Sequence, residues 1–294
     1  MKTLTIQGPR PKDVSIARIG VYCFLIVCSL FFIMPLYVMI ITSLKDMEEI
    51  RQGNLFYLPK NLSTYAWPKA WGTACTGFVC EGLKPGLLNS FKITIPSVIV
   101  SVGLAAINGY ALSFWRFKGA NFFFGLCIFG AFIPYQVMIY PLLRIENILG
   151  IYSSIPGIVL VHTIFGMPIL TLIFRNYYSN LPIDLFKAAR IDGGNFLKIF
   201  FYVILPMSTP IMIVAVILQI TGIWNDFLLG LVFAGRENQP MTVQLNNIVQ
   251  VDFGVAEYNV DMAATILTSL VPLLVYFFSG RFFVRGIAAG ALKG

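Results

Sequence analysis

Residues 181–206, LPIDLFKAARIDGGNFLKIFFYVILP, have residue types and spacing that point to docking on another protein. Pro182 can begin a helix because its missing N–H is not needed in the first turn. The negative charge of Asp184 suits the positive end of the helix dipole. Gly193 follows Asp192 and can adopt the positive φ that ends a helix. We therefore predict a short helix between Pro182 and Asp192.

This predicted helix carries small side chains, and a second helix follows it. The face that we expect to dock is formed by Leu185, Ala188, Ala189 and Asp192. A short helix held off the membrane by a sharp turn suits insertion into a groove on a partner. Asn195 can cap the second helix, which runs toward Leu205-Pro206 at the entry to the next apolar segment.

Patterns for catalysis, metal binding and nucleotide binding are missing from the sequence. His162 is the single histidine, and one histidine cannot supply the usual zinc ligand sets. We expect it to be buried against a neighbouring helix. The sequence has no G-x-x-x-x-G-K-[ST] phosphate loop, so the chain cannot bind a nucleotide in that way. We predict a non-catalytic chain that binds no cofactor and no metal.

The elements that must position these residues are membrane spans. Hydrophobic residues make up 57% of the 294 residues and charged residues only 12%, whereas soluble domains carry about 25% charge. Six apolar runs are long enough to cross a hydrocarbon core of about 30 Å. They lie at about 19–44, 87–114, 121–143, 151–174, 203–229 and 262–284. The sequence thus predicts an all-α integral membrane protein with six transmembrane helices.

The basic residues predict the orientation of these spans. If the N-terminus is cytoplasmic, most of the Lys and Arg residues lie in cytoplasmic segments, as the positive-inside rule requires. The net charge of +8 then reflects topology, and we expect no binding to nucleic acid. The predicted parts are a cytoplasmic segment 1–18, a membrane domain 19–284 with its core at about 87–284, a cytoplasmic loop 175–202 and a cytoplasmic tail 285–294.

Cys75 and Cys80 lie in the first outer loop of this topology, facing a compartment in which disulfides persist. They are five positions apart with Gly77 between them. A tight turn could therefore bring their Cα atoms within the roughly 4.4–6.8 Å that a disulfide needs. We predict this disulfide, although two unpaired thiols remain an alternative because spacing alone does not prove a bridge. The cysteines expected to stay reduced are Cys23, Cys28 and Cys127.

The stretch 181–206 resembles the EAA loop of ABC-importer permeases. Ala188-Ala189 is followed by Gly193 after three residues and by Leu205-Pro206 after eleven more, with Asp192 just before the glycine. Lys187 departs from the family, which has glutamate there, and this puts one contact with the ATPase in doubt. The resemblance implies that the loop forms a coupling helix that inserts into a cleft on an ATPase subunit. The residues implied in coupling are Asp184, Lys187, Ala188, Ala189, Asp192, Gly193, Leu205 and Pro206.

Further matches extend the resemblance along nearly the whole chain. Asn89-Ser90, Tyr110-Ala111-Leu112 and LPKNLSTYAW at 58–67 match the family, and RFFVRGIAAGALKG at 281–294 is similar to the tails of the second permease in maltose-type carbohydrate importers. The chain is identified as a member of the binding-protein-dependent inner-membrane components. The implied fold is that of type I importer permeases, similar to the methionine importer. The sequence FKAARIDG at 186–193 and the outer-loop cysteines resemble the glucose/mannose branch of this permease family.

The resemblance also implies partners and a pathway in a bacterial or archaeal cell membrane. The partners are a second, different permease, an extracytoplasmic solute-binding protein, membrane lipid, and two ATP-binding-cassette ATPase subunits that hold the ATP and Mg. The residues implied in the sugar pathway are Gln219, Trp224, Asn225 and Asp226. An aromatic ring can stack on a sugar and an amide can bond its hydroxyl groups. Helix packing and an interfacial aromatic anchor are an equally open interpretation of these residues.

Two alternatives remain at this stage. An ion-coupled secondary transporter would show internal repeats and ionisable residues at membrane depth, and we see no repeat in the sequence. Within the permease family, the cargo could instead be an oligosaccharide, a polyol or glycerol phosphate. The sequence does not decide between these cargoes, because the contacts to substrate can belong mainly to the second permease.

Overall fold

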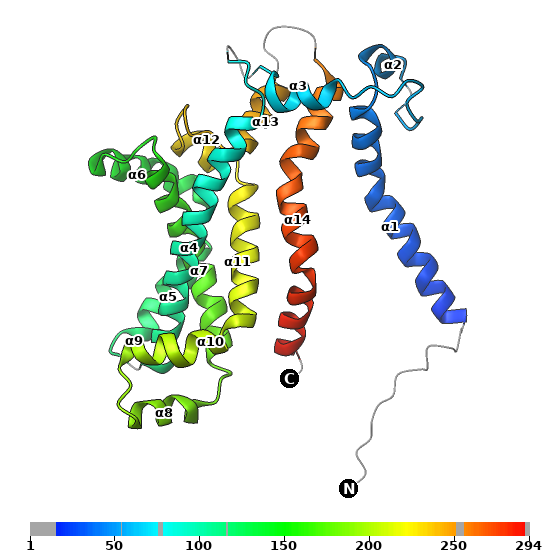
Figure 1. The fold of residues 1–294 in the computed structure, drawn as a ribbon. Helices are drawn as coiled ribbons and strands as arrows, with labels where there is room; N and C mark the ends of the chain where they lie inside the picture. Colours follow the sequence, from blue (N-terminus) through cyan, green and yellow to red (C-terminus); the bar gives the residue numbers. More distant parts are fainter. Residues whose placement is uncertain (1–15, 54, 76–78, 116, 251–255, 292–294) are drawn as a thin grey trace.

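The computed structural model describes residues 16–53, 55–75, 79–115, 117–250 and 256–291, and its elements are helices (Figure 1). Among these residues, four segments are long and apolar enough to cross a membrane: Arg18–Ser43, Lys84–Phe114, Ile155–Tyr178 and Tyr258–Gly280. They belong to α1 (Ile16–Ser43), α4 (Lys84–Phe114), α7 (Ile155–Tyr178) and α14 (Tyr258–Ala291). Four of the predicted spans are thereby confirmed, with ends shifted by a few residues.

The predicted span 121–143 is bent, which corrects the expectation of a continuous helix. It is divided into α5 (Ala120–Ala131) and α6 (Tyr135–Leu149), which meet at 108°. Pro134 accounts for the break, because proline disfavours a helical backbone at the residue before it and has no N–H to donate. The described chain has four spans, or up to six if each bent pair crosses the membrane as one.

The predicted span 203–229 is also wrong as a single helix. Its first limb consists of α9 (Phe196–Ile199), a π-helical turn at Phe200–Ile204 and α10 (Leu205–Met207). This limb meets α11 (Thr209–Trp224) at 82°. Pro206 and Pro210 lie on the two sides of the break, and each removes one backbone donor from the helix. Because α11 ends at Trp224, the last predicted residues of this span lie outside it.

Shorter helices mark the two ends of the membrane helices (Figure 1). One end carries α2 (Met47–Arg51), α3 (Ala66–Gly72) and α13 (Met241–Val249), and we call it the α3 end. The short α12 (Leu228–Phe233) lies between α11 and α13 in the chain. The opposite end carries α8 (Ile183–Ile191), and we call it the α8 end.

The main core lies where α4 packs along α7. Gly109 allows the two backbones to approach, because an added Cβ would lie 2.7 Å from the Cβ of Phe174 and 2.9 Å from the backbone nitrogen of Arg175. On the other side of α11, α14 packs against both α11 and α1. Most side chains of α1 stay exposed, so this helix presents a nearly unbroken apolar surface.

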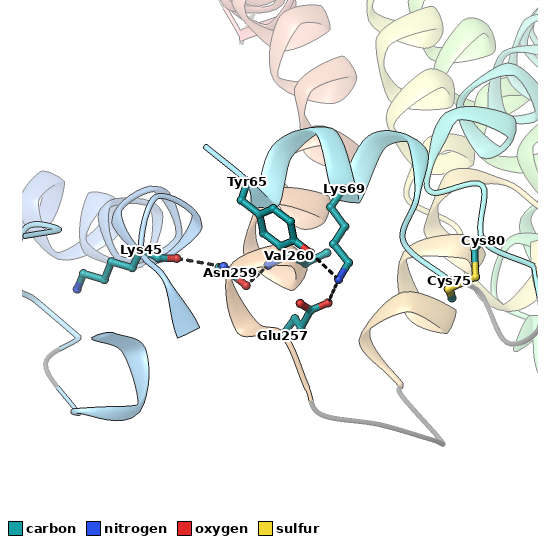
Figure 2. A network of polar contacts seen from close by, with 8 residues as sticks. All are labelled: Lys45, Tyr65, Lys69, Cys75, Cys80, Glu257, Asn259 and Val260. Atoms are coloured by element: carbon teal, nitrogen blue, oxygen red, sulfur yellow. Dashed lines mark hydrogen bonds and ion pairs between the residues drawn. A yellow bond between two sulfur atoms is a disulfide. The ribbon is translucent and has the colours of Figure 1, made fainter. Parts of the chain in front are cut away.

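A second, smaller core holds the α3 end together. It buries small residues of α3 and α14 around the ring of Trp224. Lys69 on α3 forms an ion pair with Glu257 and donates to the hydroxyl oxygen of Tyr65 at 3.1 Å (Figure 2). The hydrogen bond to Glu257 raises the pKa of Lys69 above its ordinary value. The Nδ2 of Asn259 donates to the backbone oxygen of Lys45 at 3.1 Å, which joins α14 to the segment that follows α1.

The predicted cytoplasmic segments at the ends of the chain are only partly covered by the described residues. Residues 1–15 of the predicted segment 1–18 lie outside them, as do residues 292–294 of the predicted tail. Residues 285–291 of the predicted tail form the last part of α14, which ends at Ala291. The division into a membrane domain and two cytoplasmic ends stays a prediction.

Candidate functional site

The helix α8 occupies the position that the sequence predicts for a docking helix. Pro182 precedes its first residue, and Asp184 lies in the first turn. Asp184 and Lys187 face each other at 3.3 Å as an exposed pair on the helix surface, and such pairs stabilise a helix by only about 0.3–0.5 kcal/mol. Figure 1 shows α8 beyond the ends of the membrane helices, below α9 and α10.

The end of α8 is fixed by its two glycines. Gly193 has a φ of 78°, and its N–H donates to the backbone oxygen of Arg190 at 3.1 Å. The N–H of Gly194 donates to the backbone oxygen of Ala189 at 2.9 Å. Together these bonds form the Schellman motif, in which a left-handed residue closes the helix. The sequence prediction that glycine ends this helix is confirmed.

Asn195 begins the next limb as the sequence predicts. Its Oδ1 accepts the backbone N–H of Lys198 at 2.9 Å, which satisfies a donor that the first turn of a helix would otherwise leave free. The limb then reaches Leu205 and Pro206, which lie just before the 82° bend. Leu205 packs against the main core, whereas Pro206 is exposed.

The predicted small-residue face of α8 is divided between two sides of the helix. Ala188 is exposed, but Ala189 is half-buried and packs against the main core. Ala189 therefore supports the helix from the inner side. Three large aliphatic side chains of α8 are exposed, Ile183, Leu185 and Ile191, of which Ile191 is 85% exposed. Ile183 and Leu185 point to nearly opposite sides of the helix, about 200° apart, and Ile191 lies farthest from Phe186. Ile183 and Ile191 were not among the contact residues predicted from the sequence.

A cluster of aromatic rings holds the inner side of α8. The ring of Phe186 stacks on Phe114 with centroids 5.0 Å apart and meets the edge of Trp115 at 5.8 Å. Tyr110 lies at the centre of the cluster, is fully buried, and donates its hydroxyl hydrogen to the backbone oxygen of Phe196 at 3.2 Å. These contacts join α8 and α9 to the end of α4.

Arg190 adds a second attachment between α8 and α4. Its guanidinium carbon lies 4.6 Å from the centroid of the Trp115 ring, a geometry that is worth about 0.5–1 kcal/mol at an exposed site. We call the set of Tyr110, Phe114, Trp115, Phe186, Phe196 and Arg190 the aromatic base of α8. Any displacement of α8 must therefore move the end of α4 or break these contacts.

The bend before α11 is tied to the end of α7. Tyr177 donates its hydroxyl hydrogen to the backbone oxygen of Met207 at 2.9 Å. Ser208 is fully buried, and its hydroxyl lies 3.1 Å from the hydroxyl of Tyr178. The limb that carries Leu205 and Pro206 is thus attached to α7 on one side and, through the aromatic base, to α4 on the other.

Two of the predicted pathway residues are buried inside the chain. Gln219 is 8% exposed, and its Nε2 donates to the backbone oxygen of His162 at 3.4 Å. Trp224 is 1% exposed, and its Nε1 donates to the backbone oxygen of Thr268 at 3.0 Å. The ring of Trp224 also meets Phe91 edge-on at 5.2 Å. In this structure both side chains connect helices, which is the packing interpretation of the sequence.

The other two pathway candidates follow the end of α11. Asn225 is exposed. The carboxylate of Asp226 accepts the backbone N–H of Gly230 at 2.8 Å and that of Leu229 at 3.3 Å, so it caps α12. Burial raises the pKa of Asp226, and the hydrogen bonds from Gly230 and Leu229 oppose that rise. Of the four predicted pathway residues, Asn225 has the side chain that is freest to meet a solute.

The two cysteines of the 45–83 segment are bonded to each other in the structure, and their Cα atoms are 3.8 Å apart (Figure 2). That separation is below the predicted range of about 4.4–6.8 Å. Gly77, which the sequence analysis invoked for the turn, lies outside the described residues. Cys23, Cys28 and Cys127 are unpaired. His162 is 6% exposed, as expected for a histidine inside a span.

Comparison with known proteins identifies the family of this chain. Residues 101–289 match the model of the family described as the binding-protein-dependent transport system inner membrane component. The matched segment includes α8, its aromatic base, the bend and α11. The chain belongs to this family. It is therefore a multi-pass membrane component of a transport system, and the ion-coupled alternative loses its support.

Individual relatives carry related descriptions. The chain is 45% identical over 170 residues to a probable ABC transporter permease of Pyrococcus horikoshii, an alignment that spans 58% of this chain and 61% of that relative. It is 30% identical over 285 residues to the glucose import system permease GlcU of Saccharolobus solfataricus, over 93% of this chain and 95% of the relative. It is 32% identical over 270 residues to the sn-glycerol-3-phosphate permease UgpE of Pectobacterium atrosepticum, over 90% and 93%.

A solved structure has the same fold. One chain of a bacterial ABC transporter involved in the import of the acidic polysaccharide alginate superposes with a TM-score of 0.76 at 21% identity. The superposition covers 92% of this chain and 99% of that one. The predicted fold class, an ABC importer permease built from helices, is confirmed.

Proposed function

We propose that this chain is one of two different permease subunits of an ATP-driven sugar importer, and that α8 is the element that docks on an ATPase subunit. The observation that carries the proposal is the form of α8. The helix stands beyond the membrane helices (Figure 1) and exposes Ile191 on the side away from Phe186, whose ring holds the inner side. A short helix of this form suits a groove on a partner.

The outer side of α8 supplies the contacts, and the inner side transmits force. Burying a side chain such as that of Ile191 in a groove would contribute about 1.5–3 kcal/mol, and the small Ala188 lets a partner approach the backbone. The charged residues Asp184 and Lys187 are exposed on the same face of α8 as Ala188 and Ile191, at spacings of three and four residues. With the exposed Asp192, they would add polar contacts to the partner. Ala189, Gly193, Leu205 and Pro206 would support the helix.

The remaining partners follow from the same proposal. ATP and Mg would be bound by the ATPase subunits, and this chain would bind no cofactor and catalyse no reaction. The α8 end and both chain termini would face the cytoplasm. The α3 end would then face outward, where a solute-binding protein delivers the cargo.

The cargo is proposed to be a sugar, with glucose or a related hexose preferred and a polyol or glycerol phosphate as the alternative. Support comes from the glucose permease that is similar over nearly the whole chain, whereas the glycerol phosphate permease supports the alternative. A groove of about 250 Å³ between α4, α11 and α14 has a mainly apolar lining. Because sugars need many hydrogen-bonding groups, a complete pathway would require polar groups from the second permease.

Replacing Ile191 by serine tests the docking proposal. We expect Ile191→Ser to reduce recovery of the ATPase with the affinity-purified permease about tenfold, since it removes roughly 1.4 kcal/mol or more of apolar burial. Leu197→Ser is the matched control, because Leu197 is an exposed aliphatic residue on α9, outside α8. Equal recovery of the ATPase with both variants would contradict the assignment of α8.

A transport assay tests the pathway proposal separately. We expect Asn225→Ala to raise the substrate concentration for half-maximal uptake, because an exposed amide that bonds a hydroxyl is lost. The control is Gln52→Ala, a change of another exposed amide on the α3 side. Unchanged uptake kinetics in the Asn225 variant would remove this residue from the pathway and leave the docking proposal untouched.

A further inference from the structure

The loop between α2 and α3 exposes an unusual amount of apolar surface. Its five large apolar side chains are between 54% and 76% exposed, and they are Leu55, Phe56, Tyr57, Leu58 and Leu62. A stretch of this kind on an ordinary surface loop would be unstable in water and usually marks an interaction site. We call residues 55–62 the apolar loop.

Hydrogen bonds hold the apolar loop beside the end of α1. Tyr37 donates its hydroxyl hydrogen to the backbone oxygen of Phe56 at 2.9 Å. The backbone N–H of Lys60 donates to Glu49 Oε1 at 2.9 Å, and that of Ser63 donates to the backbone oxygen of Leu44 at 3.0 Å. The chain therefore leaves α1, passes through α2, folds back along α1 and returns to it.

The bond to Tyr37 sets the depth of the loop. Tyr37 lies six residues before Ser43, the last residue of α1, which is about 9 Å along the helix axis. Side chains on a helix lean toward its N-terminus, so the hydroxyl of Tyr37 does not point past the end of α1. Phe56 and its neighbours thus lie beside the last turns of the span Arg18–Ser43. Figure 1 shows this loop next to the end of α1.

The surface around the apolar loop continues the exposed apolar surface of α1. On α1, the side chains of Ile33, Leu36 and Ile40 are all more than 40% exposed. In the most apolar 18-residue stretch of this span, only 6% of the residues are buried. A soluble partner would need a polar rim around an apolar centre. Here the apolar loop instead joins an apolar span, with Lys60 as its one charged residue.

The geometry points to membrane lipid as the partner of this surface: the apolar loop inserts its side chains into the boundary between headgroups and acyl chains at the α3 end. The exposed backbone of the loop keeps it out of the hydrocarbon core, where unpaired peptide groups are not tolerated. The boundary region accepts both the apolar side chains and the peptide groups. Tyr57 and Tyr65 are exposed here and are of the type that gathers at this level. The loop thereby anchors α2 and α3 to the membrane surface.

A photoreactive side chain identifies the partner directly. Benzoylphenylalanine is placed at position 58 of the complete transporter in phosphatidylcholine vesicles, which are then illuminated. We expect a lipid adduct on the peptide that contains residue 58, several-fold above the yield with the same group at the exposed position 52, just after α2. An adduct to another protein subunit, or a lipid yield no higher than at position 52, overturns the inference.

Fluorescence quenching measures the depth independently. The variants Leu58→Trp and Gln52→Trp are compared after subtraction of the signal from the four native tryptophans. We expect phosphatidylcholine brominated near the headgroup to quench the added indole more strongly in Leu58→Trp than in Gln52→Trp. Iodide in the water should give the opposite order. Equal or reversed quenching overturns the placement. Both experiments leave the assignment of α8 unaffected, because they report on the α3 end alone.

Discussion

The two ends of the membrane helices both expose large aliphatic side chains, but they place them differently. At the α8 end, Ile191 lies on a helix that stands beyond the spans (Figure 1). At the α3 end, Leu58 lies on a loop that folds back beside a span. The same apolar chemistry therefore suits a protein groove in one place and lipid in the other. We propose that a partner protein covers the first surface and lipid the second, because the two surfaces lie differently relative to the spans.

The two ends also differ in how they are held. The α8 end depends on stacked rings and a glycine turn. The α3 end is fixed by a core around Trp224, an ion pair and a disulfide (Figure 2). This difference would suit movement of the α8 end during transport and a fixed structure at the α3 end.

The largest expected effect concerns the α3 end. Trp224→Ala should destabilise the chain by about 3–5 kcal/mol, because it leaves a cavity in the smaller core. Trp224→Phe is the control, since it keeps most of the ring volume and loses the hydrogen bond to Thr268, at a cost of about 1 kcal/mol. Thermal unfolding of the purified chain measures both. A fully stable Trp224→Ala variant with impaired uptake would restore Trp224 to the pathway.

The second prediction concerns the aromatic base of α8. Phe186→Ala should cost about 2 kcal/mol, roughly half the value for a fully buried ring, because Phe186 is half-buried. It should also uncouple ATP hydrolysis from substrate, since α8 then moves without α4. Phe201→Ala is the matched control, as Phe201 is 51% exposed on the neighbouring limb. Substrate-stimulated ATP hydrolysis that stays normal in Phe186→Ala would show that the base does not transmit movement.

The third prediction separates the two glycines of the α8 turn. A Cβ on Gly194 would lie 2.6 Å from the backbone oxygen of Ala189, whereas a Cβ on Gly193 meets open space. Gly193→Ala therefore costs only the strain of its positive φ, about 1–2 kcal/mol, and Gly194→Ala should cost more. Recovery of the ATPase complex from the two variants checks this order. The reverse order would mean that Gly193 itself contacts the partner.

The smallest expected effect concerns the ion pair at the α3 end. Lys69 and Glu257 are partly exposed, so Lys69→Met should cost about 0.2–1 kcal/mol. Because the pKa of Lys69 is raised in the fold, this contribution is complete below the ordinary lysine value and is lost as the pH rises through the raised one. Thermal unfolding at about pH 8, well below the ordinary lysine pKa, measures it against Lys84→Met, a change of another exposed lysine. A loss of several kcal/mol would show that the pair supports more than the α3 end.

Much of the fold could be predicted because long apolar runs and glycine or proline signals act locally. Four spans, the Schellman end of α8 and the cap at Asn195 all depend on residues close in sequence. The two bends were missed, although Pro134 and Pro206 were visible. Apolar runs alone do not tell whether a proline kinks a span or divides it.

The site was harder to predict because its faces depend on tertiary contacts. Ala188 and Ala189 are neighbours in sequence, yet Ala189 packs on the core and Ala188 does not. Trp224 suggested a sugar contact by type, but Thr268 and Phe91, both distant in sequence, bury it. The aromatic base could have been suspected from Phe114 and Trp115, two adjacent aromatic residues at the end of a predicted span. No prediction was made from them.

The most direct test of the account places benzoylphenylalanine at position 191 in the assembled, ATP-hydrolysing transporter. Since Ile191 is 85% exposed on the outer side of α8, we expect illumination to join this chain covalently to an ATPase subunit. The same group at position 197 of α9 provides the comparison and should give far less of that adduct. An adduct at position 191 to lipid alone, with no link to the ATPase, would contradict the assignment of α8 as the docking helix.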